Sequence, residues 1–203
     1  MKAQTKETQA NLTPKGALNL LLEGNQRFVA NTQVKRDLNA QVQDTINGQY
    51  SFAVVLGCID SRVPMELLFD QGIGDLFSVR VAGNIVNEDV LGSIEYSCKV
   101  AGSKVIVVLG HTKCGAVTAA CKNVELGNIT ALLSKIKPAV DAVRSGEEAM
   151  TSEEIEKVSV VNVELSIKQI LDESPIIAEM VKNGEVEIVG ARYDLNTGKV
   201  HVL

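Results

Sequence analysis

The chain has 203 residues, of which 45% are apolar and 22% charged, and its 20 Lys and Arg against 25 Asp and Glu give a net charge of −5. These values are typical of one globular domain, and the lack of a basic excess argues against nucleic acid as a partner. No run approaches ~18 consecutive apolar residues, which argues against a membrane span and membrane partners.

The N-terminal region is expected to contribute a polar tail and one helix. Residues 1–12 are polar and lack an apolar signal-peptide region, so we expect a cytoplasmic protein, with a trimmed secreted or periplasmic form left open. Thr13 as N-cap and Pro14 at the first helical position predict a helix over 13–30, which Gly24-Asn25 weakens or bends. Such a helix either covers the core of its own domain or reaches a partner subunit as an arm.

From residue 52 onward, strand patterns alternate with helix patterns. This alternation predicts an α/β fold for a single domain over 13–203: a mostly parallel central sheet with an antiparallel edge strand, flanked by helices and carrying an N-terminal helical arm. The expected strands cover 52–57, 76–81 and 104–109, with a terminal hairpin over 186–193 and 199–203. The expected helices cover a short turn ending at 68, 88–101, a segment from about 114, 129–144 and 152–172.

Three potential metal ligands follow two of the predicted strands. Cys58 comes after the first strand, and His111 and Cys114 come after the strand over 104–109. Thiolate sulfur together with imidazole is the donor set that zinc prefers, and three protein ligands leave a fourth position open for catalysis. The carboxyl ends of parallel strands are where α/β proteins bind ligands. The sequence therefore predicts one catalytic Zn²⁺ per chain.

Asp60 and Arg62 are predicted to act beside this metal. Side chains of an extended segment alternate, so Cys58, Asp60 and Arg62 share one face. Two thiolates already neutralise the charge of Zn²⁺, so a water bound to the metal is acidified less than it would be by neutral ligands. A carboxylate beside the open position reduces the acidity of that water further unless a cation restrains the carboxylate. We expect Arg62 to hold Asp60 in a two-pronged ion pair. If released, Asp60 becomes a possible fourth ligand in a closed state that low pH favours.

Other interpretations of these residues explain less of the pattern. A thiol redox protein accounts for neither His111 nor the Asp60–Arg62 pair, and a structural zinc module lacks a fourth soft ligand. A nucleotide-binding protein requires a glycine-rich phosphate loop, which is absent from the sequence. The remaining cysteines, Cys98 and Cys121, are expected in the core as small apolar residues.

These motifs closely resemble those of the β-class carbonic anhydrases. The family's Cys-x-Asp-x-Arg motif stands here as Cys58 to Arg62, and its His-x-x-Cys-Gly motif as His111 to Gly115. The resemblance extends from about residue 13 to about residue 194. It implies the reversible hydration of CO₂ to bicarbonate and a proton through zinc-bound hydroxide. It also implies a homodimer built through N-terminal helical arms, often paired into a homotetramer.

The resemblance also assigns a substrate pocket. It implies that Gln49 donates a hydrogen bond to a substrate oxygen, and that Phe77 and Tyr96 line the apolar part of the pocket. Ala82 stands where the family usually has Val, and Gly115 closes the second motif beside the substrate.

Two alternatives within the family stay open. The ligand motifs do not distinguish CO₂ hydration from the hydrolysis of CS₂ or COS by the same scaffold. Val55 stands where some members carry a Trp of an allosteric bicarbonate site, which favours the noncooperative subtype.

Overall fold

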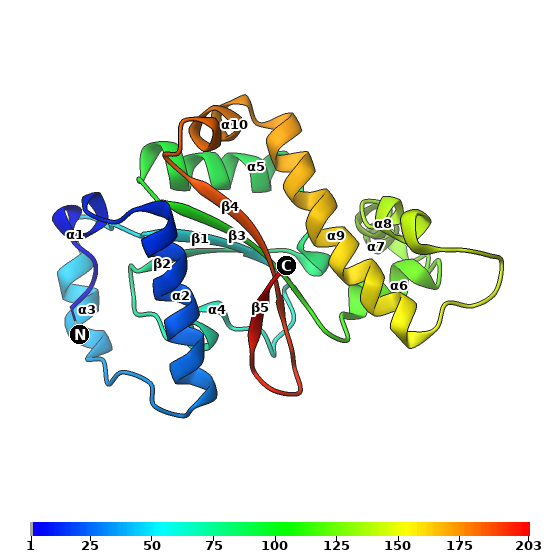
Figure 1. The fold of residues 1–203 in the computed structure, drawn as a ribbon, viewed down its shortest axis with the longest axis horizontal. Coiled ribbons are helices and arrows are strands. Elements are labelled where there is room, and N and C mark those ends of the chain that lie inside the picture. Colours follow the sequence, from blue (N-terminus) through cyan, green and yellow to red (C-terminus); the bar gives the residue numbers. More distant parts are fainter. Residues whose placement is uncertain (1) are drawn as a thin grey trace.

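The computed structural model describes residues 2–203, and within them five strands form one sheet in the order β2-β1-β3-β4-β5 (Figure 1). Strands β1 to β4 are parallel, and β5 pairs antiparallel with β4 at the edge. The strands are β1 (Ala53–Gly57), β2 (Leu76–Arg80), β3 (Val105–His111), β4 (Glu187–Tyr193) and β5 (Val200–Val202). The predicted mostly parallel sheet with an antiparallel edge is confirmed.

The two faces of the sheet are covered by different helices. Every residue of β1 and β3 is buried, as expected for central strands of a parallel sheet. Alternate residues point to opposite faces: Val55 and Val107 belong to the cluster that includes Leu21 of α2, whereas Val54 and Ile106 belong to the cluster of α5, α9 and α10.

Helices surround the sheet and also extend beyond it. Before β2 they are α1 (Lys6–Ala10), α2 (Pro14–Val29), α3 (Leu38–Thr45) and α4 (Met65–Leu68). After β2 come a 3₁₀ turn (Ala82–Asn84), α5 (Glu88–Glu95) with a π turn (Tyr96–Val100), α6 (Gly115–Cys121), α7 (Gly127–Leu133), α8 (Lys137–Val143), α9 (Ser152–Glu173) and α10 (Pro175–Lys182). The stretch predicted over 129–144 is divided into α7 and α8, with Pro138 in the first turn of α8.

Residues 1–12, expected as a polar tail, contain a helix packed on the domain. Thr5 and Thr8 form a capping box that starts α1. Gln9 is buried, and its Nε2 donates to the carbonyls of Ser51 and Ala101, both at 2.8 Å. The polar segment thus includes a short docked helix, which composition does not reveal because the two hydrogen bonds that hold it are long-range.

The helix predicted over 13–30 is one continuous helix, α2, that covers its own sheet. Ala17 and Leu21 are fully buried in the core beneath it. At Gly24 and Asn25, where the sequence predicts a weak point, the helix continues unbroken and packs closely against the end of α4. The Asn25 amide donates to the carbonyls of Leu68 at 3.0 Å and Gly198 at 2.9 Å. A role for α2 as an arm between subunits stays a prediction.

Beyond the carboxyl ends of the parallel strands, α6, α7 and α8 gather beside one end of α9 (Figure 1). Their apolar residues form a third cluster, which contains Cys58, Cys114 and Cys121. Cys98 lies in the cluster under α5, so both cysteines expected in the core are found there. Across residues 2–203, no helix is both long and apolar enough to cross a membrane.

Candidate metal centre

Sheet order brings the two cysteine-containing segments together. Strands β1 and β3 are neighbours, and their register pairs Gly57 with Leu109. Cys58 immediately follows β1, while His111 is the last residue of β3. Cys114 then stands at the N-cap of α6. Segments about fifty residues apart in sequence therefore meet at one edge of the sheet.

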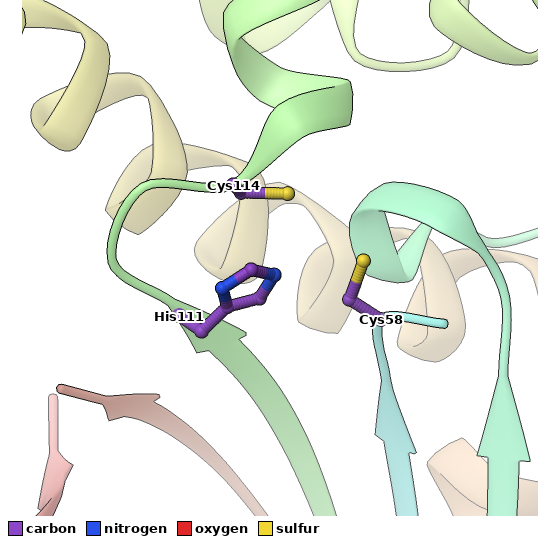
Figure 2. Close-up of side chains that lie close together, drawn as sticks. All are labelled: Cys58, His111 and Cys114. Atoms are coloured by element: carbon purple, nitrogen blue, oxygen red, sulfur yellow. The ribbon is translucent and has the colours of Figure 1, made fainter. Parts of the chain in front are cut away.

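Cys58, His111 and Cys114 converge on one point (Figure 2). One donor atom from each lies within 4.8 Å of the other two, and all three residues are at most 4% exposed. The His111 Nδ1 lies 2.9 Å from the Thr112 carbonyl, which fixes the ring. Its Nε2 is buried and has no hydrogen-bond partner among residues 2–203. An orphaned imidazole nitrogen facing two sulfurs fits a tetrahedral Zn²⁺.

The environment of the two sulfurs favours negative charge on one of them. The neighbouring Cys114 and His111 side chains, together with the hydrogen bond from the Gly83 backbone, outweigh burial and lower the pKa of Cys58 to about 4. The same Cys58–Cys114 contact, together with burial, raises the pKa of Cys114. A dication between the sulfurs would stabilise both as thiolates.

Asp60 lies at the mouth of this centre and is held by Arg62. The guanidinium Nε donates to Oδ1 at 2.9 Å and a terminal nitrogen donates to Oδ2 at 2.7 Å. The hydrogen bonds from the Arg62 side chain lower the pKa of Asp60 to about 2. Oδ2 lies 4.0 Å from the Nε2 of His111. The carboxylate thus faces the metal position in the two-pronged ion pair that the sequence predicts.

Arg80 and Gly83 support the first cysteine. The side chain of Arg80 donates to the carbonyls of Cys58 at 3.1 Å and Asp60 at 2.7 Å, which holds the loop after β1. The backbone N–H of Gly83 donates to the Cys58 sulfur, with a nitrogen–sulfur distance of 3.3 Å. Neither role was predicted from the residues, because both depend on pairing between β1 and β2.

A second set of contacts holds the loop between His111 and Cys114. The Lys113 N–H donates to the Glu156 carboxylate at 2.8 Å, and Arg192 of β4 donates to the same carboxylate at 2.7 Å. Glu156 lies on α9, so this long helix is tied to the metal loop. The sequence shows Glu156 only as one of many charged residues of α9.

Two of the five predicted substrate residues lie beside the metal ligands of their own chain. Ala82 precedes Gly83, whose N–H reaches the Cys58 sulfur. Gly115 follows Cys114 as the first residue of α6, and it is exposed.

The other three predicted substrate residues lie away from the ligands of their own chain. Gln49 is exposed in the loop before the amino end of β1, and that strand, roughly 16 Å long, separates it from Cys58. Phe77 pairs with Val54 near the start of β1 and contacts Tyr96 edge to face, with ring centroids 6.4 Å apart. Both aromatics line a surface cavity of about 700 Å³ along β2 and α5.

Comparisons with known proteins give a consistent result. The sequence pattern of the carbonic anhydrase family matches residues 53–200. Carbonic anhydrase 2 of Mycobacterium tuberculosis is 35% identical over 195 residues, which cover 93% of this chain and 92% of that protein. The β-carbonic anhydrase of Coccomyxa, solved with acetazolamide, has a TM-score of 0.72 at 26% identity, covering 92% of this chain and 86% of that one. A tetrameric β-carbonic anhydrase of Sordaria macrospora has a TM-score of 0.70 at 27% identity, covering 80% and 85%.

Proposed function

The chain belongs to the β-class carbonic anhydrases, and on this premise we propose that it catalyses the reversible hydration of CO₂ to bicarbonate and a proton. The observation that carries the proposal is the buried, orphaned Nε2 of His111, which faces two cysteine sulfurs beside an arginine-held carboxylate. Cys58, His111 and Cys114 would hold one zinc ion. When bound, zinc supplies a Lewis acid that lowers the pKa of a coordinated water, so that a nucleophile is available near neutral pH.

Asp60 would orient the nucleophile. Its carboxylate stays ionised because the Arg62 hydrogen bonds keep its pKa at about 2, so it can only accept hydrogen bonds. An attacking oxygen that donates its proton to Asp60 Oδ2 has its lone pair directed away from that carboxylate, toward the substrate carbon. Arg62 keeps Asp60 in this position by holding both of its oxygens.

The substrate pocket would be completed by a second copy of the chain. Gln49, Phe77 and Tyr96 lie away from the metal ligands of their own chain, and Phe77 and Tyr96 lie at the outer edge formed by β2. Large exposed apolar residues, among them Ile59, Leu67 and Tyr96, occur on the segments near this edge. A homodimer that covers it, with tetramers formed from dimers, agrees with the tetrameric Sordaria proteins.

Stopped-flow CO₂ hydration with a pH indicator tests the proposal. We expect activity in the zinc-loaded protein and a loss of about 10²–10⁴-fold in kcat/KM for Asp60→Asn, with zinc retained, because the carboxylate acts on the reacting oxygen. The exposed Asp141, which pairs with Lys137, offers the matched control Asp141→Asn, which should behave as wild type. Zinc-loaded protein that is inactive at alkaline pH would overturn the assignment. Parallel assays with CS₂ and COS separate the alternative substrates.

Two further expectations stay predictions. Closure of the site, with Asp60 as the fourth ligand at low pH, requires Arg62 to release a carboxylate that it holds with two hydrogen bonds here. The cytoplasmic location rests only on the composition of the first twelve residues.

A further inference from the structure

Three polar residues lie on the buried side of α9. Ser159, Asn162 and Ser166 are each at most 5% exposed, and spacings of three and four residues place them on one face of the helix. Their neighbours on that face include Val163 and Ile170, which are fully buried. A buried hydroxyl or amide destabilises a protein unless it is hydrogen-bonded, so the partners of these residues explain their presence.

The partners belong to both segments that carry metal ligands. Ser159 Oγ donates to the His111 carbonyl at 3.2 Å. The Asn162 side-chain amide donates to the Gly83 carbonyl at 2.9 Å. Ser166 Oγ contacts the carbonyl of Asn84, the residue after Gly83, at 3.4 Å. It also donates to the Asn162 carbonyl of its own helix at 2.8 Å. The face of α9 therefore holds the backbone on either side of the metal centre.

Gly83 is the residue for which this support matters most. Its N–H donates to the Cys58 sulfur, while its φ of +71° lies in the left-handed region. The following Asn84 is also left-handed, with a φ of +44°. Glycine has no side chain to restrict its conformation, and an added Cβ would lie 2.6 Å from Ile136. The Asn84 N–H closes this turn by donating to the Val81 carbonyl at 3.0 Å, and Asn162 holds the Gly83 carbonyl from outside the turn.

We propose that Asn162 is a positioning residue of the metal centre, which keeps the Gly83 N–H on the Cys58 sulfur by holding the Gly83 carbonyl. The inference rests on the proposed function, because it concerns the zinc that Cys58 would bind. Two thiolates neutralise a zinc dication and so weaken it as a Lewis acid. A hydrogen bond to one sulfur withdraws charge from that sulfur and restores part of the acidity of the metal.

Cobalt-substituted protein reports the charge on the sulfur directly. In Asn162→Leu, which is similar in size but has no donor, we expect the sulfur-to-cobalt charge-transfer band to shift to longer wavelength, because a thiolate without its hydrogen bond is easier to oxidise. The affinity for zinc, measured by release to a chelator, should fall by about tenfold, because the turn beside Cys58 is no longer held in position, as for lost contacts behind other metal ligands. Asn162→Asp has nearly the same shape but replaces the side-chain NH₂ donor by an oxygen. It should therefore give the same shift of the band and the same change in zinc release.

Ser166→Ala is the matched control. It removes a hydroxyl from the same buried face, but the carbonyl that this hydroxyl contacts belongs to Asn84, which does not donate to the sulfur. We expect its band and its zinc release to match wild type. Equal shifts in Ser166→Ala and both Asn162 variants would mean general loosening of α9 and would overturn the proposal, as would unshifted bands in folded Asn162 variants.

A measurement on the unsubstituted chain covers the case in which the Asn162 variants do not fold. With ¹¹³Cd bound, scalar coupling from the metal to the Gly83 amide proton through sulfur is expected, and its absence would overturn the inference. A wild-type protein that binds cobalt without any thiolate charge-transfer band would instead refute the proposed function. The two failures are therefore distinguishable.

Discussion

Replacing Gly24 by alanine tests how α2 is docked on the sheet. A glycine inside a helix is usually less stable than alanine by roughly 0.5–1 kcal/mol, so the substitution would ordinarily stabilise the protein. Here an added Cβ would lie 1.7 Å from the carbonyl oxygen of Phe69. Because that oxygen is backbone, α2 must move away from α4. Helix propensity alone predicts that Gly24→Ala raises the free energy of unfolding, whereas the packing in the structure predicts that it lowers it.

The size of the loss in the free energy of unfolding depends on the contacts that are disturbed when α2 moves. Overpacking of a core costs about 1–3 kcal/mol. The neighbouring Asn25 makes three hydrogen bonds, to Leu68, Gly198 and the N–H of Val200, and losing one or two of these costs about 0.5–1.5 kcal/mol each. After subtraction of the helix-propensity gain, the free energy of unfolding should fall by about 3 kcal/mol. For a chain of this length, that lowers Tm by roughly 6–12 °C.

Gly92→Ala provides the matched control for this experiment. Gly92 also lies inside a helix, α5, but within the described residues nothing lies within 4 Å of an added Cβ. Urea and thermal unfolding, at fixed protein and zinc concentrations, should show Gly92→Ala more stable than wild type by about 0.5–1 kcal/mol. If Gly24→Ala is as stable as wild type, or gains stability as Gly92→Ala does, the docking argument is refuted.

Three further results are expected. Cys58→Ser should lose zinc by metal analysis, whereas Cys98→Ser should keep it, because only Cys58 faces the other ligands. Burial raises the pKa of Cys98 to about 12, so its thiol should resist alkylation until the protein is unfolded. Burial also raises the pKa of Asp70, but hydrogen bonds from Arg27 and Arg36 outweigh it and lower that pKa below its ordinary value. A carboxyl whose pKa is lower in the folded than in the unfolded protein stabilises the fold at pH values above its unfolded pKa, and this stabilisation is lost as the pH falls through its folded pKa. The free energy of unfolding of Asp70→Asn, which lacks this carboxyl, should therefore depend less on pH in the acid range.

Much of the candidate site can be predicted from the sequence because its chemistry is local. Zinc ligands are recognised by residue type, and Cys58, His111 and Cys114 each follow an apolar run that indicates a buried strand. The ion pair of Asp60 and Arg62 spans only two residues, so it too is local. The structure forms it in a turn, closed by the Val63 N–H on the Asp60 carbonyl at 3.0 Å, and not in the extended segment that the sequence suggests.

The features that the sequence does not show concern long-range contacts. Residues 1–12 look like a tail because the hydrogen bonds that fold α1 against Ser51 and Ala101 leave no periodic signal. The role of Gln49 toward the substrate stays a prediction: β1 separates it from Cys58 in the same chain, and whether a second copy brings it to a metal centre depends on assembly.

The sequence by itself determined which residues can bind zinc, which stretches form buried strands, and that the sheet is mostly parallel. Only the tertiary structure decided what holds those ligands in place. Asn162 and Gly83 are 79 residues apart, yet one hydrogen bond joins them behind the Cys58 sulfur. The physical reason is that side-chain periodicity records which face of an element is buried, whereas a hydrogen bond to a backbone carbonyl depends on how two elements pack and is independent of the residue type that supplies the carbonyl.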